Sequence, residues 1–159
     1  MRLLAIVLLL ALSIASHGAQ LSGRVVTVAD GDEIKIVDDS GQWHLVRLAG
    51  IEAPVRSNPF GREAQMELAG LLFPDPVRVD WEIQDRHGFI LGTVHAKGRD
   101  VGLTLLEAGL AWHLPEGPGQ TQQQRLEYAE AEEAARAAKI GLWSDPEPLA
   151  PGDWRDRNR

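Results

Sequence analysis

Cysteine is absent from all 159 residues, which excludes disulfides, thiolate metal sites and cysteine nucleophiles. Collagen-like repeats, heptad runs and low-complexity blocks are also missing. Basic residues are outnumbered by acidic ones, 16 against 23, so the formal net charge is −7. Such a chain repels polyanions on average, and no basic stripe that would mark a nucleic-acid surface is visible. Nucleic acid is therefore a disfavoured partner unless a local basic patch binds it.

What is present is the composition of one folded domain: 44% hydrophobic and 25% charged residues. The first residues have the features of an export signal. Met1 and Arg2 precede an unbroken apolar run over 3–12, and small residues follow up to Ala19. We expect a secretory signal peptide over residues 1–18, because the run is too short to span a bilayer comfortably. An uncleaved anchor is the alternative. The sequence thus predicts an exported protein, periplasmic or secreted.

The rest of the chain alternates between strand-like and helix-like patterns. Three strands, a helix, two strands and two helices follow one another, which favours an α+β fold. This order indicates a five-stranded OB-type β-barrel with a helix between strands three and four and two C-terminal helices. We expect that domain over residues 19–143 and an extended tail containing Pro and Gly over 144–159. The predicted strands are 22–29, 33–37, 43–49, 77–83 and 89–96. The first predicted helix begins at Asn58-Pro59 and is stopped by Pro74. The second covers 101–108 with Asp100 as its N-cap, and the third runs from the Thr121–Gln124 capping box to Lys139.

Alternation along the strands predicts which side chains face the core. In the third strand, Leu45 and Arg47 share one face, and Val46 and Leu48 share the opposite one. Glu33 follows Asp32, so alternation directs the Glu33 side chain away from that aspartate, although it could add a carboxylate near Asp32. The other residues expected to face inward are Val77, Val79, Trp81 and Ile83 in the fourth strand and Tyr128, Ala131, Ala135 and Ala138 in the last helix.

Short motifs follow one another along the chain in a specific order. They are VADGD at 28–32, VRLAGIEAP at 46–54, FGREA at 60–64, DRHG at 85–88, GLAW at 109–112, and a final series at 129–130, 135–136 and 141–143. Each motif alone is weak, but together, with matching gaps, they resemble the staphylococcal nuclease (thermonuclease) family over about residues 22–143. The resemblance implies an OB barrel and a calcium-dependent phosphodiesterase that acts on DNA and RNA.

The resemblance also implies a calcium site. Asp32 matches the family's first calcium-binding aspartate, and the backbone carbonyl of Ala53 matches its backbone ligand. Glu52 occupies the position of the second aspartate with a side chain one methylene longer, which the flexible coordination of calcium can accept. A turn aspartate and a surface carboxylate are the alternative interpretations of Asp32 and Glu52. We expect calcium binding to be weak.

Of three further positions, Arg47 matches the family, whereas Val55 and Phe89 depart from it. Arg47 matches a phosphate-binding arginine, with an ion pair to Asp32 or Glu52 as the alternative. Val55 occupies the position of the catalytic glutamate, and Phe89 that of the second phosphate-clamping arginine. Valine cannot accept a proton or orient water, and phenylalanine donates no hydrogen bond to a phosphate. The sequence therefore predicts a strongly impaired nuclease.

Substrate contacts are sparse. Arg86 and His87 fit the family's phosphate-contacting pair, with a solvated turn as the alternative. The loop at 114–120 lacks the tyrosines that stack a base in some members, so base affinity should be poor unless Trp112 or His113 substitutes. Trp112 is expected in the core. The competing hypothesis is a non-catalytic OB module that binds an oligonucleotide, another phosphorylated ligand or a protein.

Overall fold

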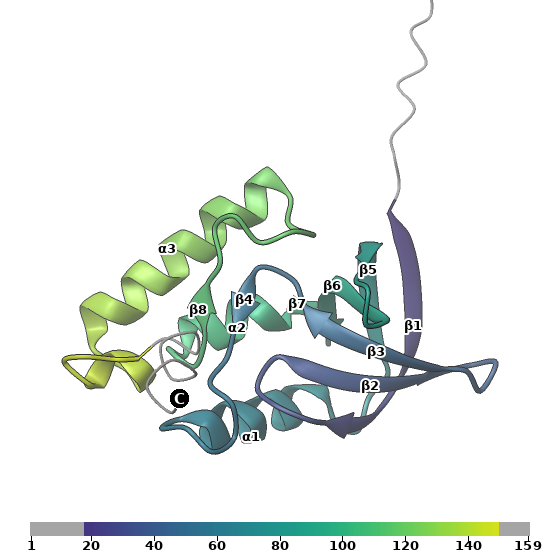
Figure 1. The fold of residues 1–159 in the computed structure, drawn as a ribbon, viewed down its shortest axis with the longest axis horizontal. Coiled ribbons are helices and arrows are strands. Elements are labelled where there is room, and N and C mark those ends of the chain that lie inside the picture. The colour runs from purple at the N-terminus through teal and green to yellow at the C-terminus, as the bar shows by residue number, and fades with distance from the viewer. Residues whose placement is uncertain (1–17, 150–159) are drawn as a thin grey trace, which may run out of the picture.

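The computed structural model describes residues 18–149 and confirms the predicted barrel. The predicted signal peptide, apart from Gly18, and the end of the predicted tail, 150–159, lie outside the described residues. Five strands form the wall of the barrel, with the chain running from purple to yellow in Figure 1. They are β1 (Ala19–Val28), β2 (Glu33–Asp38), β3 (Trp43–Leu48), β5 (Val77–Gln84) and β6 (Phe89–Ala96).

The barrel closes through one parallel pairing. The antiparallel order β3-β2-β1-β5-β6 would leave β3 and β6 as open edges. Instead, β3 pairs with β6 in parallel, with Leu45 opposite Phe89 and Arg47 opposite Leu91. Closure satisfies the backbone groups of both edges and removes them as sites of aggregation.

Three very short strands add to this frame. β4 (Ile51–Glu52) pairs with β8 (Trp112–His113), and β7 (Arg99–Asp100) pairs with the end of β6. Sequence analysis did not predict them because two residues carry no readable period. The β4–β8 pair joins the segment after β3 to the chain that leads into the last helix.

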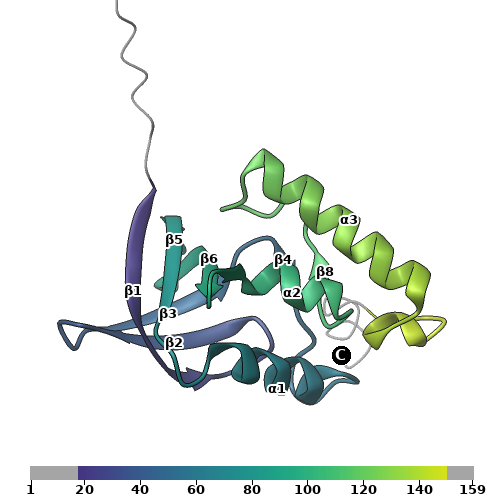
Figure 2. The same ribbon diagram turned by 180° about the vertical axis from the view of Figure 1, so that it is seen from behind.

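The helices cover the barrel on two sides. Figure 2 shows α1 along one end of the barrel and α3 on the side away from β1. Their caps confirm the predicted signals: Asp100 accepts a hydrogen bond from the Leu103 amide at 3.1 Å, and Thr121 and Gln124 form a complete capping box. Within residues 18–149, no helix has the length and apolar character needed to cross a bilayer. The helices are α1 (Gly61–Leu72), α2 (Val101–Glu107) and α3 (Gln122–Ala138), followed by a 3-10 turn, η1 (Gly141–Ser144).

Two of the predicted core positions are wrong. Ile83 is 38% exposed, because the pairing of β5 with β6 shifts register between Trp81 and Ile83 and interrupts the alternation. Ala138 is exposed, since it lies in the last turn of α3 beside an open groove between α2 and α3. The remaining predictions for the fourth strand and the last helix hold: Val77, Val79, Tyr128, Ala131 and Ala135 are buried, and Trp81 packs against the core.

The hairpin between β2 and β3 is held by one carboxylate. Asp38 accepts hydrogen bonds from the Ser40 hydroxyl at 2.6 Å and from the Ser40 and Gln42 amides at 2.9 Å. Its other oxygen lies 2.7 Å from Nε2 of His44. The Ser40 hydroxyl and His44 hold the pKa of Asp38 well below its usual range.

We therefore expect Asp38→Ala to lower the melting temperature at pH 5. A carboxylate with a lowered native pKa stabilises the fold fully above the usual aspartate pKa of about 3.9, and this contribution is lost as the pH falls through the native pKa. Thermal melts from pH 5 to pH 2 should show the gap between wild type and Asp38→Ala narrowing toward the acid end. The matched control is Asp39→Ala, which removes the exposed neighbour. A gap independent of pH would contradict the prediction.

Candidate functional site

Asp32 is positioned by a turn that requires glycine. A Cβ on Gly31 would lie 2.7 Å from the Cβ atoms of both Ala53 and Ala64, too close for any other residue without a shift. The close approach brings Asp32 against the segment after β4, where Oδ2 accepts a hydrogen bond from the Ala53 amide at 3.2 Å. The Asp32 carbonyl accepts a second bond, from the Leu48 amide at 2.9 Å.

The Asp32 carboxyl group is buried among charges. It is 8% exposed, and burial raises its pKa to about 7. The Ala53 hydrogen bond and the charge of Arg47 lower the pKa, whereas the charges of Glu33 and Glu52 raise it further. The structure therefore brings Asp32, Glu52 and Arg47 into one electrostatic neighbourhood, together with Glu33.

The residues that match the family's calcium ligands would offer a cation two carboxylates and one backbone carbonyl. Within residues 18–149, no group of three or more His, Cys, Asp or Glu side chains is placed to hold a metal ion. The set carried over from the family needs only Asp32, Glu52 and the carbonyl of Ala53, with water completing the shell, and calcium accepts such oxygen ligands. A buried carboxylate whose charged form is disfavoured would be stabilised by a cation. Asp32 is such a group.

Arg47 is held from three sides. Glu33 and Arg47 are directly opposite each other in the β2–β3 pairing. Oε1 of Glu33 accepts hydrogen bonds from Nε of Arg47 at 3.0 Å and from Nη2 at 2.5 Å. Oδ2 of Asp85 lies 3.6 Å from Nη1, and the guanidinium stands 4.5 Å from the centre of the Phe89 ring. Among residues 18–149, Arg47 thus forms ion pairs with Glu33 and Asp85, whereas the alternative from sequence had named Asp32 or Glu52.

Asp85 organises the turn that carries Phe89. Its Oδ1 accepts hydrogen bonds from the His87 amide at 2.8 Å and the Phe89 amide at 2.9 Å. Partial burial raises the pKa of Asp85, but these two donors and the positive charges of His87 and Arg47 outweigh it, so the net pKa is lowered. Asp85 therefore stays charged and faces Arg47.

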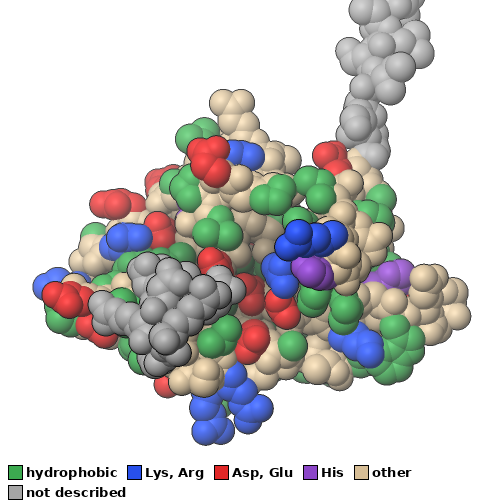
Figure 3. Space-filling view, in the orientation of Figure 1, with side chains coloured by type: hydrophobic (Ala, Val, Ile, Leu, Met, Phe, Trp, Pro, Cys, Tyr) green, Lys and Arg blue, Asp and Glu red, His purple; other side chains and the backbone are tan. Residues whose placement is uncertain are grey.

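Arg86 and His87 lie exposed in the same turn. Nε of Arg86 donates a hydrogen bond to Nε2 of His87 at 3.1 Å. Figure 3 shows Lys or Arg side chains and a histidine gathered on one face of the barrel, next to a group of Asp and Glu side chains. The predicted substrate-contacting pair is thus within one turn of the carboxylate that faces Arg47.

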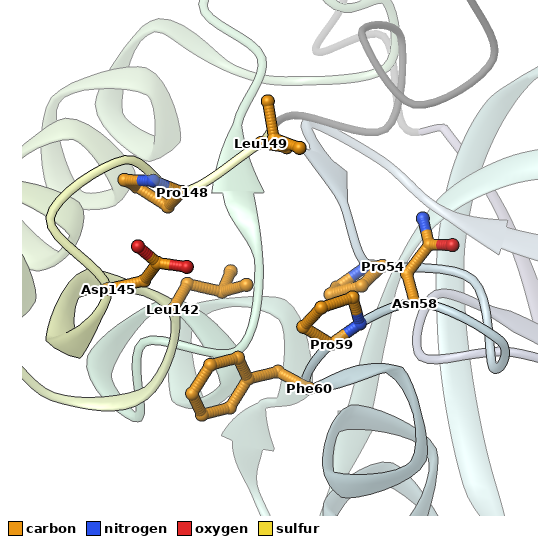
Figure 4. A pocket seen from close by; sticks show the side chains of 8 residues that line it. All are labelled: Pro54, Asn58, Pro59, Phe60, Leu142, Asp145, Pro148 and Leu149. Carbon is orange, nitrogen blue, oxygen red and sulfur yellow. The ribbon is translucent and has the colours of Figure 1, made fainter. Parts of the chain in front are cut away.

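Val55 points toward solvent from the loop between β4 and α1. It is 43% exposed and lines a shallow surface depression with Asp30, Arg56 and Arg62. The same loop borders a small apolar pocket, where Pro54, Pro59 and Phe60 lie opposite the chain that follows α3 (Figure 4). The pocket is lined by Pro54, Asn58, Pro59, Phe60, Leu142, Asp145, Pro148 and Leu149.

Within the described residues, β8 and the chain from it to α3 (112–121) present no exposed aromatic ring. Trp112 is buried, as expected, and packs edge-on against Trp143 with 6.2 Å between ring centres. His113 is also buried and lies edge-on to Tyr128 at 5.8 Å. Neither ring is presented to a nucleotide base.

Comparison with known proteins agrees with the barrel fold. The family model for staphylococcal nuclease homologues matches residues 45–145. The chain is 37% identical over 146 residues to a micrococcal nuclease of Shigella flexneri, covering 86% of this chain and 82% of the relative. It is 36% identical over 146 residues to protein ParB of Escherichia coli, with 86% and 80% covered. An uncharacterized endonuclease of Haemophilus influenzae is 32% identical over 136 residues, with 86% and 74% covered. The chain belongs to the staphylococcal nuclease family.

Sequence analysis named Glu33 as a carboxylate that could lie near Asp32 but did not predict its pairing with Arg47, and it missed Asp85 altogether. Glu33 was directed away from Asp32 by alternation, yet its charge acts on Asp32 and its carboxylate holds Arg47. Counting outward from the Asp38–Gly41 turn would have placed Glu33 opposite Arg47. Asp85 gave no such signal, because its approach to Arg47 depends on the β3–β6 closure.

We expect Asp32→Asn to stabilise the protein when no divalent cation is present. Asparagine retains an oxygen acceptor for the Ala53 amide but removes a buried negative charge that lies near two other carboxylates. Denaturant unfolding in EDTA at pH 8 should show a gain of about 1–3 kcal/mol. Asp39→Asn, at an exposed position, should change little. Lower stability of Asp32→Asn than of wild type would contradict the prediction. It would mean that the contacts of the Asp32 carboxylate outweigh the cost of burying its charge.

Proposed function

We propose that this protein is an exported thermonuclease-type domain that binds a cation and a phosphate group but hydrolyses phosphodiester bonds very slowly. The observation that carries the proposal is Val55: at the position that matches the catalytic glutamate, an apolar side chain faces solvent and offers no proton acceptor. Calcium is the cation that the family resemblance favours, and the Asp32, Glu52 and Ala53 donors suit it. Export rests on residues 1–18 of the sequence alone.

Phosphodiester hydrolysis needs a proton acceptor and a hydrogen-bond donor to the phosphate, which Val55 and Phe89 cannot provide. A water oxygen bonds to phosphorus, an ester oxygen leaves, and the water proton must be accepted. Loss of a positioned base commonly costs about 10²–10⁴ in rate, and loss of one charge-stabilising donor about 10²–10³. These losses are not strictly additive, but Arg47 alone would face the charge that develops on the phosphate. Turnover close to background is the consequence.

Nucleic acid is the substrate class that the relatives favour. A relative is named micrococcal nuclease and others are named endonucleases. The net charge of −7 and the burial of Trp112 and His113 both argue for weak affinity. We therefore assign low affinity as well as slow turnover to DNA and RNA.

A calcium-dependent plasmid-nicking assay on the purified mature domain tests the proposal. Wild type should nick at near-background rates, and Val55→Glu combined with Phe89→Arg should nick at least about 100-fold faster, since a base and a phosphate donor are restored. Adding Asp32→Ala to that pair should abolish the gain.

The matched control for the restored pair is Val55→Gln with Phe89→Leu, which changes the same positions without adding a base or a charge. Vigorous, EDTA-sensitive digestion by wild type would overturn the proposal. No gain from Val55→Glu with Phe89→Arg would favour the non-catalytic binding module.

Calcium should raise the melting temperature of wild type but not of Asp32→Asn. A ligand that binds only the native state stabilises it by mass action; with a dissociation constant of about 1 mM, 10 mM calcium would contribute about 1.4 kcal/mol. Thermal melts in calcium and in EDTA measure this difference, with Asp39→Asn as the matched charge control. An equal calcium effect in Asp32→Asn and wild type would place the cation elsewhere.

A further inference from the structure

We propose that Glu33 is an intramolecular competitor of phosphate for Arg47. Its Oε1 occupies the Nε and Nη2 edge of the guanidinium, one of the two edges that can bind an oxyanion in bidentate fashion. The proposal rests on the proposed function in one respect: Arg47 is taken as the phosphate-binding residue. It adds that the site is blocked by this chain's own carboxylate.

The competition is built into the barrel. Glu33 and Arg47 are opposite residues of neighbouring strands, so the two side chains leave the sheet together on the outer face. Their neighbours Ile34 and Val46 are an opposed pair on the inner face and are buried. Repacking of the core is therefore not required to bring Glu33 to Arg47, or to separate them.

Both partners remain within reach of a ligand. The Arg47 side chain is 37% exposed and the Glu33 side chain 26% exposed. A phosphate oxygen can therefore approach Arg47 from solvent, but it must take over donors that the carboxylate already uses. Displacement of Glu33 would also leave its negative charge beside the incoming anion.

Two further groups keep Arg47 in place. Asp85 lies on the other terminal nitrogen, Nη1, at 3.6 Å, and its backbone donors hold it charged. The Phe89 ring packs against the guanidinium face. Phosphate therefore meets an arginine that is neutralised by two carboxylates and stacked on a ring, and Glu33 is the partner on the Nε and Nη2 edge.

Glu33→Gln tests the proposal. The substitution keeps the shape of the side chain and removes its charge. The probe is fluorescein-labelled octathymidylate, and binding is followed by fluorescence anisotropy in EDTA at 50 mM salt. Because partly exposed ion pairs contribute modestly, we expect Glu33→Gln to bind about fivefold more tightly than wild type. Glu133→Gln on α3 makes the same change in net charge at an exposed position and should change affinity less than twofold.

A double-mutant cycle shows whether the gain passes through Arg47. In an Arg47→Gln background, Glu33→Gln should give no more than the twofold change of the control. Glu33→Thr is a second variant without the carboxylate. Provided that both variants fold as wild type by circular dichroism, it should show the same gain in affinity as Glu33→Gln.

The proposal is overturned if Glu33→Gln gains no more than Glu133→Gln, if the gain persists without Arg47, or if both Glu33 variants fail to bind the probe measurably. These outcomes are separate from the fate of the proposed function. Binding in EDTA requires no hydrolysis, so rapid plasmid digestion by wild type would reject slow turnover and leave the Glu33 comparison to be decided by its own result.

Discussion

The parallel pairing of β3 with β6 is the contact on which the site depends. It closes the barrel, and by the same hydrogen bonds it sets Arg47 beside the strand that begins at Phe89. Asp85 reaches Arg47 only because the turn before β6 is carried to that edge. The buried neighbours of Arg47, Val46 and Leu48, are part of the core that this closure encloses. The closed barrel is therefore required for the contacts of Arg47 with Asp85 and Phe89.

The cluster has an unequal balance of charge. Glu33 and Asp85 face Arg47 directly, while Asp32 lies behind them in a buried position influenced by Glu33 and Glu52. Negative charge exceeds positive charge in this region, as it does over the whole chain. Such a region attracts cations and resists anions until a cation is bound. The charges around Asp32 and Arg47 thus favour the proposed cation over the proposed phosphate ligand.

Much of the fold was predictable because alternation and helix caps are local signals. The five barrel strands and both C-terminal helices follow from them. The prediction that Ile83 faces the core was wrong, because a register shift between paired strands leaves no signal in a single sequence. In the site, the retained and replaced positions could be named from the motifs, but the partners of Arg47 could not. Glu33 required the hairpin register, and Asp85 required the closed barrel.

The strand that carries Arg47 has two faces with separate duties. Val46 and Leu48 hold the barrel together from inside, whereas Arg47 and Leu45 lie on the outer face. Val55 likewise faces solvent from a loop of which Pro54, Asn58 and Pro59 line an apolar pocket. Residues on the outer surface are thus not subject to the packing constraints that act on the interior. Substitution at Val55 or Arg47 can therefore change the chemistry of this surface while leaving the buried residues of the barrel untouched.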